Sequence, residues 1–189
     1  RDSNKIVIVN GKVQQFNFEY EESDKINITI LDTLNQNLNQ DNSLLSLNNS
    51  FSNKIHNILV KKNYSLKKPL IIYQITNEKV SNTNINFQLN FDLEESSSIK
   101  IINFSDDNSE KNFINNLFNF NLDKNAILKN YKIDKKNNTN IKYDYSSIIQ
   151  KENSISETFI FSSGSDYVKN EVNCNPVSYT HLTLPTTVF

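Results

Sequence analysis

From Ile55 onward the chain is a succession of short runs of β-forming residues, and this succession limits its fold more than any other feature. In residues 85–91, isoleucine, phenylalanine and leucine alternate with polar residues, which is the pattern of a half-buried strand. No amphipathic helix of ordinary length interrupts residues 85–175, so the sequence predicts an all-β fold. Further runs of the same kind are Ile58–Val60, Leu70–Tyr73, Ile99–Phe104, Phe118–Leu122, Ile127–Ile133, Ile141–Tyr145, Ile155–Phe161 and Val168–Cys174.

The first fifty residues predict a hairpin, a further strand and a short helix. Lys5–Val9 is an apolar run that ends at Asn10-Gly11 and is followed by Lys12-Val13. Asn-Gly between β-forming residues is a strong hairpin signal, because both turn residues must take positive φ. Asp24–Leu31 reads as another strand. Residues 32–54 place leucines among Asn, Gln and Ser, which indicates a short helix and a loop.

Two architectures fit so many short strands. A sandwich or an up-and-down barrel needs tight reversals that usually use Gly or Pro, and this chain has only 2 Gly and 3 Pro. A parallel β-helix turns its corners without such hairpins and stacks like side chains, which suits the many Asn and aromatic residues. The strand spacing wanders between roughly 10 and 18 residues, a range that both architectures allow. The residues by themselves favour the solenoid and leave the sandwich open.

Composition excludes several classes of function. Lys+Arg 20 against Asp+Glu 21 leaves no field of one sign, so we expect no nucleic-acid partner and no membrane-surface partner. No run is long and apolar enough to span a membrane. One cysteine and two histidines make a disulfide framework or a Cys/His zinc site a poor interpretation. The chain has no Met and begins at Arg1, so we expect a piece of a longer protein.

Three segments resemble the SufD family of iron–sulfur cluster assembly proteins. KIVIVNGKVQQ (residues 5–15) is similar to the strand-Asn-Gly-strand that follows this family's N-terminal helices. Residues 91–133 resemble a later passage of the family, and Asn125-Ala126-Ile127-Leu128 with Tyr131 match its last strand. Ser163–Asn173 resembles the core signature that SufB and SufD share, with Ser165 in place of a second Gly and Lys169 in place of the usual Arg. The resemblance runs from about Lys5 to Asn175.

The resemblance implies a right-handed parallel β-helix, incomplete at both ends, in a cytoplasmic scaffold subunit that is not an enzyme. Its implied partners are a SufB-like paralogue and a SufC-like ATPase. The parent complex would handle the iron–sulfur cluster, while this chain binds no cofactor. The family's residues for cluster assembly and for ATPase docking lie beyond Asn175, so the resemblance assigns no catalytic, cofactor-binding or metal-binding residue here. SufB is the close alternative; Val9-Asn10-Gly11 and the lack of a second cysteine favour SufD.

The residues that could carry chemistry have plainer interpretations. Cys174 alternates with Val172 and is expected to be a buried strand cysteine. His56 stands by itself and is expected at the surface or as a cap. Lys169 and Glu171 are expected to form an exposed ion pair of small value. Solvated loop charges are expected at Glu94-Glu95, Asp106-Asp107 and Lys135-Lys136.

The last fourteen residues differ in composition from the rest. Residues 176–189 (PVSYTHLTLPTTVF) contain no Asn, Lys, Asp, Glu or Ile, and SYTHLTLPTT resembles a translated sequencing adapter. Pro176 also stands where a β-forming residue is expected. The predicted organisation is therefore a segment 1–54 that leads into the core, a truncated β-helix core over 55–175, and a non-native tail over 176–189.

Two other functions remain open at this stage. One is a carbohydrate-active β-helix or adhesin, although a secretion signal and a cluster of like charges on one face are not visible. The other is an all-β interaction module without cluster chemistry.

Overall fold

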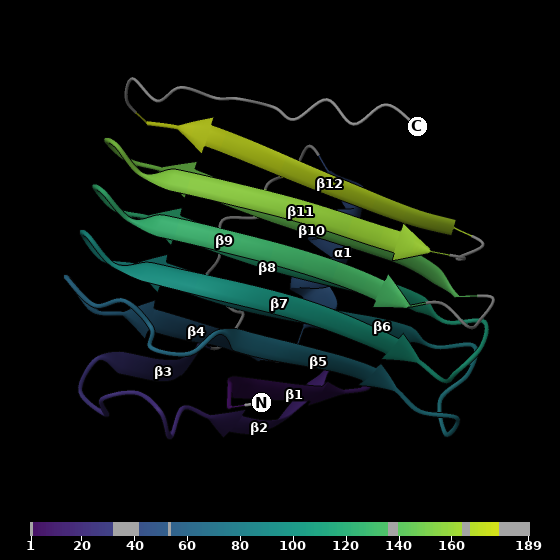
Figure 1. The fold of residues 1–189 in the computed structure, drawn as a ribbon. Helices are drawn as coiled ribbons and strands as arrows, with labels where there is room; N and C mark the ends of the chain where they lie inside the picture. Colours follow the sequence, from purple (N-terminus) through teal and green to yellow (C-terminus); the bar gives the residue numbers. More distant parts are fainter. Residues whose placement is uncertain (1, 32–41, 53, 136–139, 164–166, 178–189) are drawn as a thin grey trace.

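The protein is a parallel β-solenoid of about four turns (Figure 1). The computed structural model describes residues 2–31, 42–52, 54–135, 140–163 and 167–177. These residues hold twelve strands and one helix. In chain order the elements are β1 (Asn4–Val9), β2 (Lys12–Asn17), β3 (Ile26–Leu31), α1 (Ser43–Phe51), β4 (Ile55–Val60), β5 (Leu70–Thr76), β6 (Asn84–Leu93), β7 (Ser98–Asp107), β8 (Phe113–Leu122), β9 (Ile127–Lys135), β10 (Ile141–Gln150), β11 (Ile155–Ser163) and β12 (Tyr167–Pro176).

From β4 onward, successive strands alternate between two six-stranded sheets. Sheet A has the order β11-β9-β7-β5-β1-β2, and sheet B has the order β12-β10-β8-β6-β4-β3. All pairings among the strands from β5 to β12 are parallel. The predicted all-β solenoid is therefore confirmed, and the sandwich is wrong. Each turn carries one strand of each sheet, so stacked residues such as Asn90 and Asn119 lie 29 positions apart. The repeat spans two strands, which is why single-strand spacing shows no fixed period.

The N-terminal segment joins both sheets. β1 and β2 form the predicted antiparallel hairpin, in which Asn10 (φ 50°) and Gly11 (φ 74°) occupy the turn. β1 also pairs in parallel with β5, while β3 pairs antiparallel with β4. At this end of the solenoid each sheet therefore finishes on an antiparallel strand.

Asparagine supplies the corners that glycine and proline would otherwise provide. Seven non-glycine residues in the described part have positive φ, and five of them are Asn. Asn is the side chain best suited to this left-handed backbone after glycine, because its short amide can bond locally. One corner recurs in successive coils at Asn63, Ser96, Asn125 and Asn153. Opposite charges next to these corners also form ion pairs between successive coils, as in Lys62–Glu95 (2.6 Å) and Lys124–Glu152 (2.9 Å).

Helix α1 lies on the outer face of sheet B. Its N-cap is Asn42, whose side-chain oxygen accepts the N–H groups of Leu44 (3.0 Å) and Leu45 (3.3 Å). The Asn48 amide donates to the carbonyl oxygen of Asn115 (2.7 Å), and Leu45 packs with Leu117 and two tyrosines of β10. The helix predicted within residues 32–54 is thus confirmed over Ser43–Phe51, while residues 32–41 and 53 lie outside the described part.

The space between the sheets is the core. In its first coils it is mostly apolar, with Ile72, Leu89 and Phe91 fully buried and the polar Gln74 and Thr76 buried at the end of β5. Stacking along the axis repeats side chains, as in the near-parallel rings of Phe91 and Phe120, whose centroids are 5.2 Å apart. No helix of the described residues is long and apolar enough to cross a membrane.

β12 ends at Pro176. This strand lies at the edge of sheet B, and the N–H of Val177 donates to the carbonyl of Gln150 (2.8 Å), so proline at an edge is accommodated. The predicted tail over 176–189 stays a prediction, because residues 178–189 lie outside the described part.

Candidate functional site

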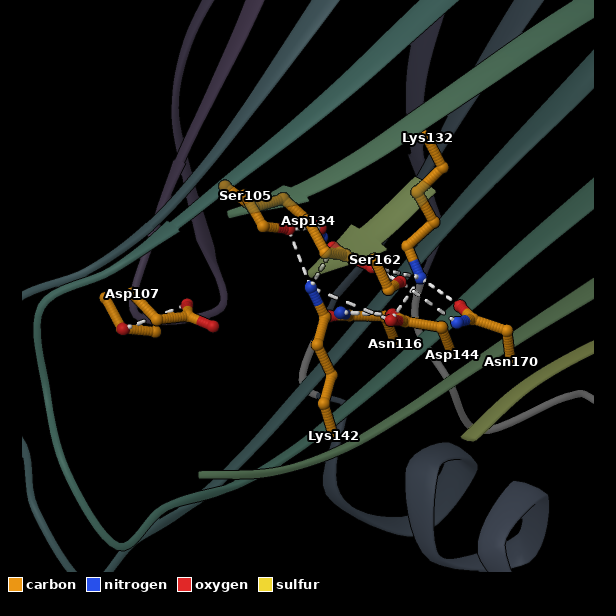
Figure 2. Close-up of polar contacts among 11 residues, drawn as sticks. Ser105, Asp107, Asn116, Lys132, Asp134, Lys142, Asp144, Ser162 and Asn170 are labelled. Atoms are coloured by element: carbon orange, nitrogen blue, oxygen red, sulfur yellow. Dashed lines mark hydrogen bonds and ion pairs between the residues drawn. The ribbon is translucent and has the colours of Figure 1, made fainter. Parts of the chain in front are cut away.

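Four charged side chains lie inside the solenoid between β9 and β10 (Figure 2). They are Lys132 and Asp134 on β9, and Lys142 and Asp144 on β10, and each side chain is 8% exposed or less. Lys142 Nζ lies 2.7 Å from Asp134 Oδ1, and Lys132 Nζ lies 3.3 Å from Asp134 Oδ2. Lys132 also forms a short ion pair with Asp144, which itself lies 3.7 Å from Lys142. Two cations and two anions thus form one closed, charge-balanced cluster, here called the charged cluster.

Neutral side chains of the neighbouring coils complete the cluster's hydrogen bonds. Ser105 lies below Asp134 in sheet A, and its hydroxyl accepts from Lys142 Nζ (2.6 Å). Ser162 lies above Asp134 and donates to its Oδ2 (3.0 Å). In sheet B, Asn116 below Asp144 donates to its Oδ1 (2.6 Å). Buried charges persist in a protein interior when they are paired and hydrogen-bonded in this way.

The strand period places the charged cluster inside. Side chains alternate across a strand, so on β9 the even-numbered residues from Leu128 to Asp134 face inward, and so do those of β10 from Lys142 to Gln150. On β9 the apolar side chains Ile127, Tyr131 and Ile133 face outward instead. The interior of this coil therefore holds the mostly polar, even-numbered side chains of β9.

The electrostatics of the charged cluster favour the ionised forms of Asp134 and Lys142. Burial alone would raise the pKa of Asp134, but the charges of Lys142 and Lys132 and the hydrogen bonds lower this pKa to about 2. Burial alone would lower the pKa of Lys142, and the surrounding carboxylates Asp144, Asp134 and Asp107 raise it instead. Asp134 and Lys142 are thus held ionised by the opposite charges around them.

Asp107 lies beside the charged cluster. The prediction of a solvated loop at Asp106-Asp107 is wrong, because both residues belong to β7 and alternate positions of that strand face inward. The Thr76 hydroxyl donates to Asp107 Oδ1 (3.1 Å). Burial raises the pKa of Asp107, an effect that the Lys142 charge and the Thr76 hydrogen bond offset only in part.

The family model described as the SUF system FeS cluster assembly, SufBD core domain, matches residues 73–179, more than half of the chain. The chain belongs to the SufBD core family. The match begins on β5 and includes all of the charged cluster. It assigns this SufBD core protein a role in SUF iron–sulfur cluster assembly and membership of a SUF complex. A search of curated proteins found no match.

The SufBD core carries its single cysteine away from the charged cluster. Cys174 lies on β12 above Ile148 and packs against the apolar core, but it is half-buried, whereas the sequence predicted a buried cysteine. Burial raises the pKa of its thiol. Within the described residues, no group of three or more His, Cys, Asp and Glu side chains could hold a metal ion.

His56 is not at the surface. β4 places it at 9% exposure with its ring against Phe16, at 5.3 Å between centroids, so the surface interpretation is wrong. Burial, together with the charge of Lys54, lowers the pKa of His56.

The remaining predicted charges lie at the periphery. Lys169 and Glu171 form the expected exposed ion pair (2.9 Å), with Lys169 also 5.3 Å from the ring centre of Tyr143. Glu94 and Glu95 follow β6 and pair with lysines of the preceding corner. Lys135 ends β9, and Lys136 lies outside the described residues, as do residues 164–166 of the family signature.

Sequence reasoning missed the charged cluster. The sequence analysis identified the run Ile127–Ile133 by its apolar residues and did not consider the alternate residues Asn130, Lys132 and Asp134, because a polar face of a strand ordinarily faces solvent. A signal was nevertheless present. The Lys-x-Asp spacing of Lys132 and Asp134 is repeated ten residues later by Lys142 and Asp144. Two Lys-x-Asp pairs on consecutive strands can neutralise each other across a solenoid.

Proposed function

We propose that this SufBD core protein is a SufD-like scaffold subunit that acts without catalytic chemistry of its own. Its partners would be a SufB-like paralogue and a SufC-like ATPase in the cytoplasm, and the cluster being assembled would be the cargo of the complex. The observation that carries the proposal is the match of the SufBD core domain to residues 73–179, a range that includes the stacked strands β6 to β12.

The cysteine content supports SufD over SufB. The chain has one cysteine, and the burial that raises the pKa of Cys174 disfavours the thiolate, which is the form that binds iron. A subunit that bears the cluster would need a thiol that ionises readily. Cys174 instead behaves as a small apolar side chain of the core.

The charged cluster supports a scaffold role. Its carboxylates and ammonium groups bond to one another and to Ser105, Asn116 and Ser162, so their hydrogen-bonding capacity is used in joining coils. Fixed coils would keep the outer faces of both sheets in constant register for a partner.

Co-purification tests this function. A tagged chain would be co-expressed with a SufB-like protein and a SufC-like ATPase, and the bound proteins identified by mass spectrometry. We expect the SufB-like protein to be retained and the ATPase to be retained only when the SufB-like protein is present. Direct retention of the ATPase by residues 1–175, or no retention of either protein, would contradict the proposal.

Reconstitution separates SufD from SufB. Under anaerobic conditions with iron and sulfide, we expect the chain alone to develop no cluster absorbance, with the Cys174→Ser variant as the matched control. A cluster that forms on the chain and is lost in Cys174→Ser would identify a SufB-like subunit.

A further inference from the structure

A cavity of about 760 Å³ lies at the N-terminal end of the solenoid, far from the charged cluster in sequence. Its walls come from the β1–β2 hairpin, the end of α1 and the beginnings of β4 and β6, and include Gly11, Lys12, Phe16, Phe51, Lys54 and His56. This volume is typical of sites that hold small organic molecules.

One wall of the cavity is held rigidly. Gly11 sits in the hairpin turn at φ 74°, and a Cβ atom at this position would lie 2.8 Å from Ile85 Cγ2 and 3.2 Å from the backbone oxygen of Asn86. The turn therefore packs directly on the start of β6. The chain positions this hairpin with a close backbone contact that only glycine permits.

The cavity has a mixed lining in which polar side chains lie beside several large apolar and aromatic ones. The Phe16 and His56 rings are tilted by 55° at 5.3 Å, and both line the cavity. Phe51 and Ile30, which are 60% and 55% exposed, also line it. Large apolar side chains that gather around a hollow provide a surface for a flat apolar group.

Two buried polar atoms of the cavity-lining residues have no hydrogen-bond partner among the described residues. They are His56 Nδ1 and Asn86 Oδ1. Both atoms have less than 1 Å² of accessible surface, so a ligand in the cavity does not contact them in this conformation. The His56 ring nevertheless forms part of the wall, so its NMR signal can report on a ligand that packs there.

The charge of the lining is positive. Lys12 and Lys54 line the cavity, and none of the described residues that line it is acidic. Elsewhere on this chain lysines pair with carboxylates of a neighbouring coil, as Lys62 does with Glu95. A cavity with two lysines and no lining carboxylate is complementary to an anion.

We propose that this cavity binds a small organic anion with a planar aromatic ring. The ring would lie against Phe16 and Phe51, and its carboxylate or phosphate would face Lys12 and Lys54. This proposal does not depend on the SufD-like assignment.

Titration with an aromatic carboxylate tests the proposal on the intact chain. The probe is naphthoate, and the readout is the NMR signal of the His56 ring. The chain has two histidines, so a His181→Gln variant leaves one ring signal to follow. We expect a saturable shift with a Kd of about 0.1–1 mM, which is what a ligand of this size reaches with moderate efficiency. The uncharged naphthalenemethanol should bind at least about fivefold more weakly, because it lacks the attraction to the lysines.

Variants locate the site. Lys12→Gln with Lys54→Gln should raise the Kd for naphthoate about tenfold, since both attractive charges are lost. Phe51→Ala changes an exposed side chain, should leave the unfolding transition unchanged, and should raise the Kd about threefold or more. The matched control is Lys100→Gln with Lys129→Gln on the outer face of sheet A, which should leave the Kd unchanged.

Three outcomes would overturn the proposal. They are a ring signal that does not shift up to millimolar naphthoate, equal weakening by the control pair, and equal affinity for the uncharged alcohol. The first would show that no such anion enters the cavity, and the other two would show binding that the lysines do not direct.

Discussion

The interior of the solenoid differs between its first and its later coils. On β6 the inward side chains are apolar, and on β5 the apolar Leu70 and Ile72 are followed by the buried polar Gln74 and Thr76. Neither strand has a charged side chain in its inward row. Two coils further along the axis, β9 and β10 place Lys132, Asp134, Lys142 and Asp144 between the same two sheets (Figure 2). The backbone pairing is parallel and continuous through both regions.

The difference shows that in a solenoid the shape of the backbone and the filling of the interior are separate requirements, whereas a globular core meets both with the same side chains. The backbone ladder supplies the shape, so a coil can replace part of its apolar interior with paired charges, as β9 and β10 do while Leu128 and Ile148 stay buried. Apolar layers contribute the transfer free energy of buried surface. A buried ion cluster contributes little net free energy but penalises misalignment, because each charge needs its own partner. We infer that the charged cluster specifies which strands stack, while the apolar coils supply stability.

The largest effect is expected from removing one charge of the charged cluster. Lys142→Met leaves Asp134 and Asp144 facing a single lysine inside the solenoid, and breaking a buried pair in this way costs about 3–5 kcal/mol. The free energy of unfolding from urea titration measures this loss. Lys129→Met is the control, because Lys129 pairs with Glu157 at the surface and should change stability by less than about 0.5 kcal/mol.

A second change should restore balance to the Lys142→Met variant. Adding Asp134→Leu leaves Lys132 paired with Asp144, so the double variant should regain about half of the lost free energy or more. A double variant that is less stable than Lys142→Met would mean that the charges are not coupled.

A large-to-small change in an apolar coil should cost somewhat less. Leu89→Ala removes a fully buried side chain and leaves a cavity, at about 2–5 kcal/mol depending on how far the site relaxes. A second substitution that removes a charge should not restore the stability of Leu89→Ala, whereas Asp134→Leu is expected to restore that of Lys142→Met. Rescue of Leu89→Ala by Asp134→Leu would contradict the separation of the two regions.

Acid should act on the charged coils. Asp134 has a pKa of about 2 in the folded protein, below its ordinary value of 3.8, so its contribution is present above about pH 4 and is lost as the pH falls towards 2. The shift corresponds to about 2 kcal/mol. Urea titrations at several pH values should show a smaller decline between pH 5 and 2 for Asp134→Asn than for the unchanged chain. Equal declines would show that Asp134 is not held ionised by the lysines.

The smallest effect is expected at Cys174. Val is close to Cys in volume, and position 174 packs on Ile148 in the core layer, so Cys174→Val should cost less than about 1.5 kcal/mol. Cluster assembly by the complex should persist with this variant. Loss of assembly with an unchanged unfolding transition would make Cys174 a cluster ligand.

Part of this protein could be determined from the sequence by itself. Local backbone chemistry fixed the β1–β2 hairpin, because Asn10-Gly11 between β-forming residues has few other conformations. The alternation in residues 85–91 fixed a strand and its two faces. The helix over Ser43–Phe51 was placed only within a broad segment, since its stability depends on packing against Asn115 and Leu117 of sheet B rather than on its own pattern.

The tertiary structure decided which half of each alternation is the inside. On β6 the apolar half faces the core, whereas on β9 Lys132 and Asp134 do so and Tyr131 faces outward. A two-residue period identifies two faces but does not say which one another coil will cover. On β9 that choice depends on contacts with β10. The charges of the two strands neutralise each other only when the folded chain brings β9 and β10 to opposite sides of the interior. The position of His56 in the core was decided in the same way, by Phe16 from a hairpin forty residues earlier.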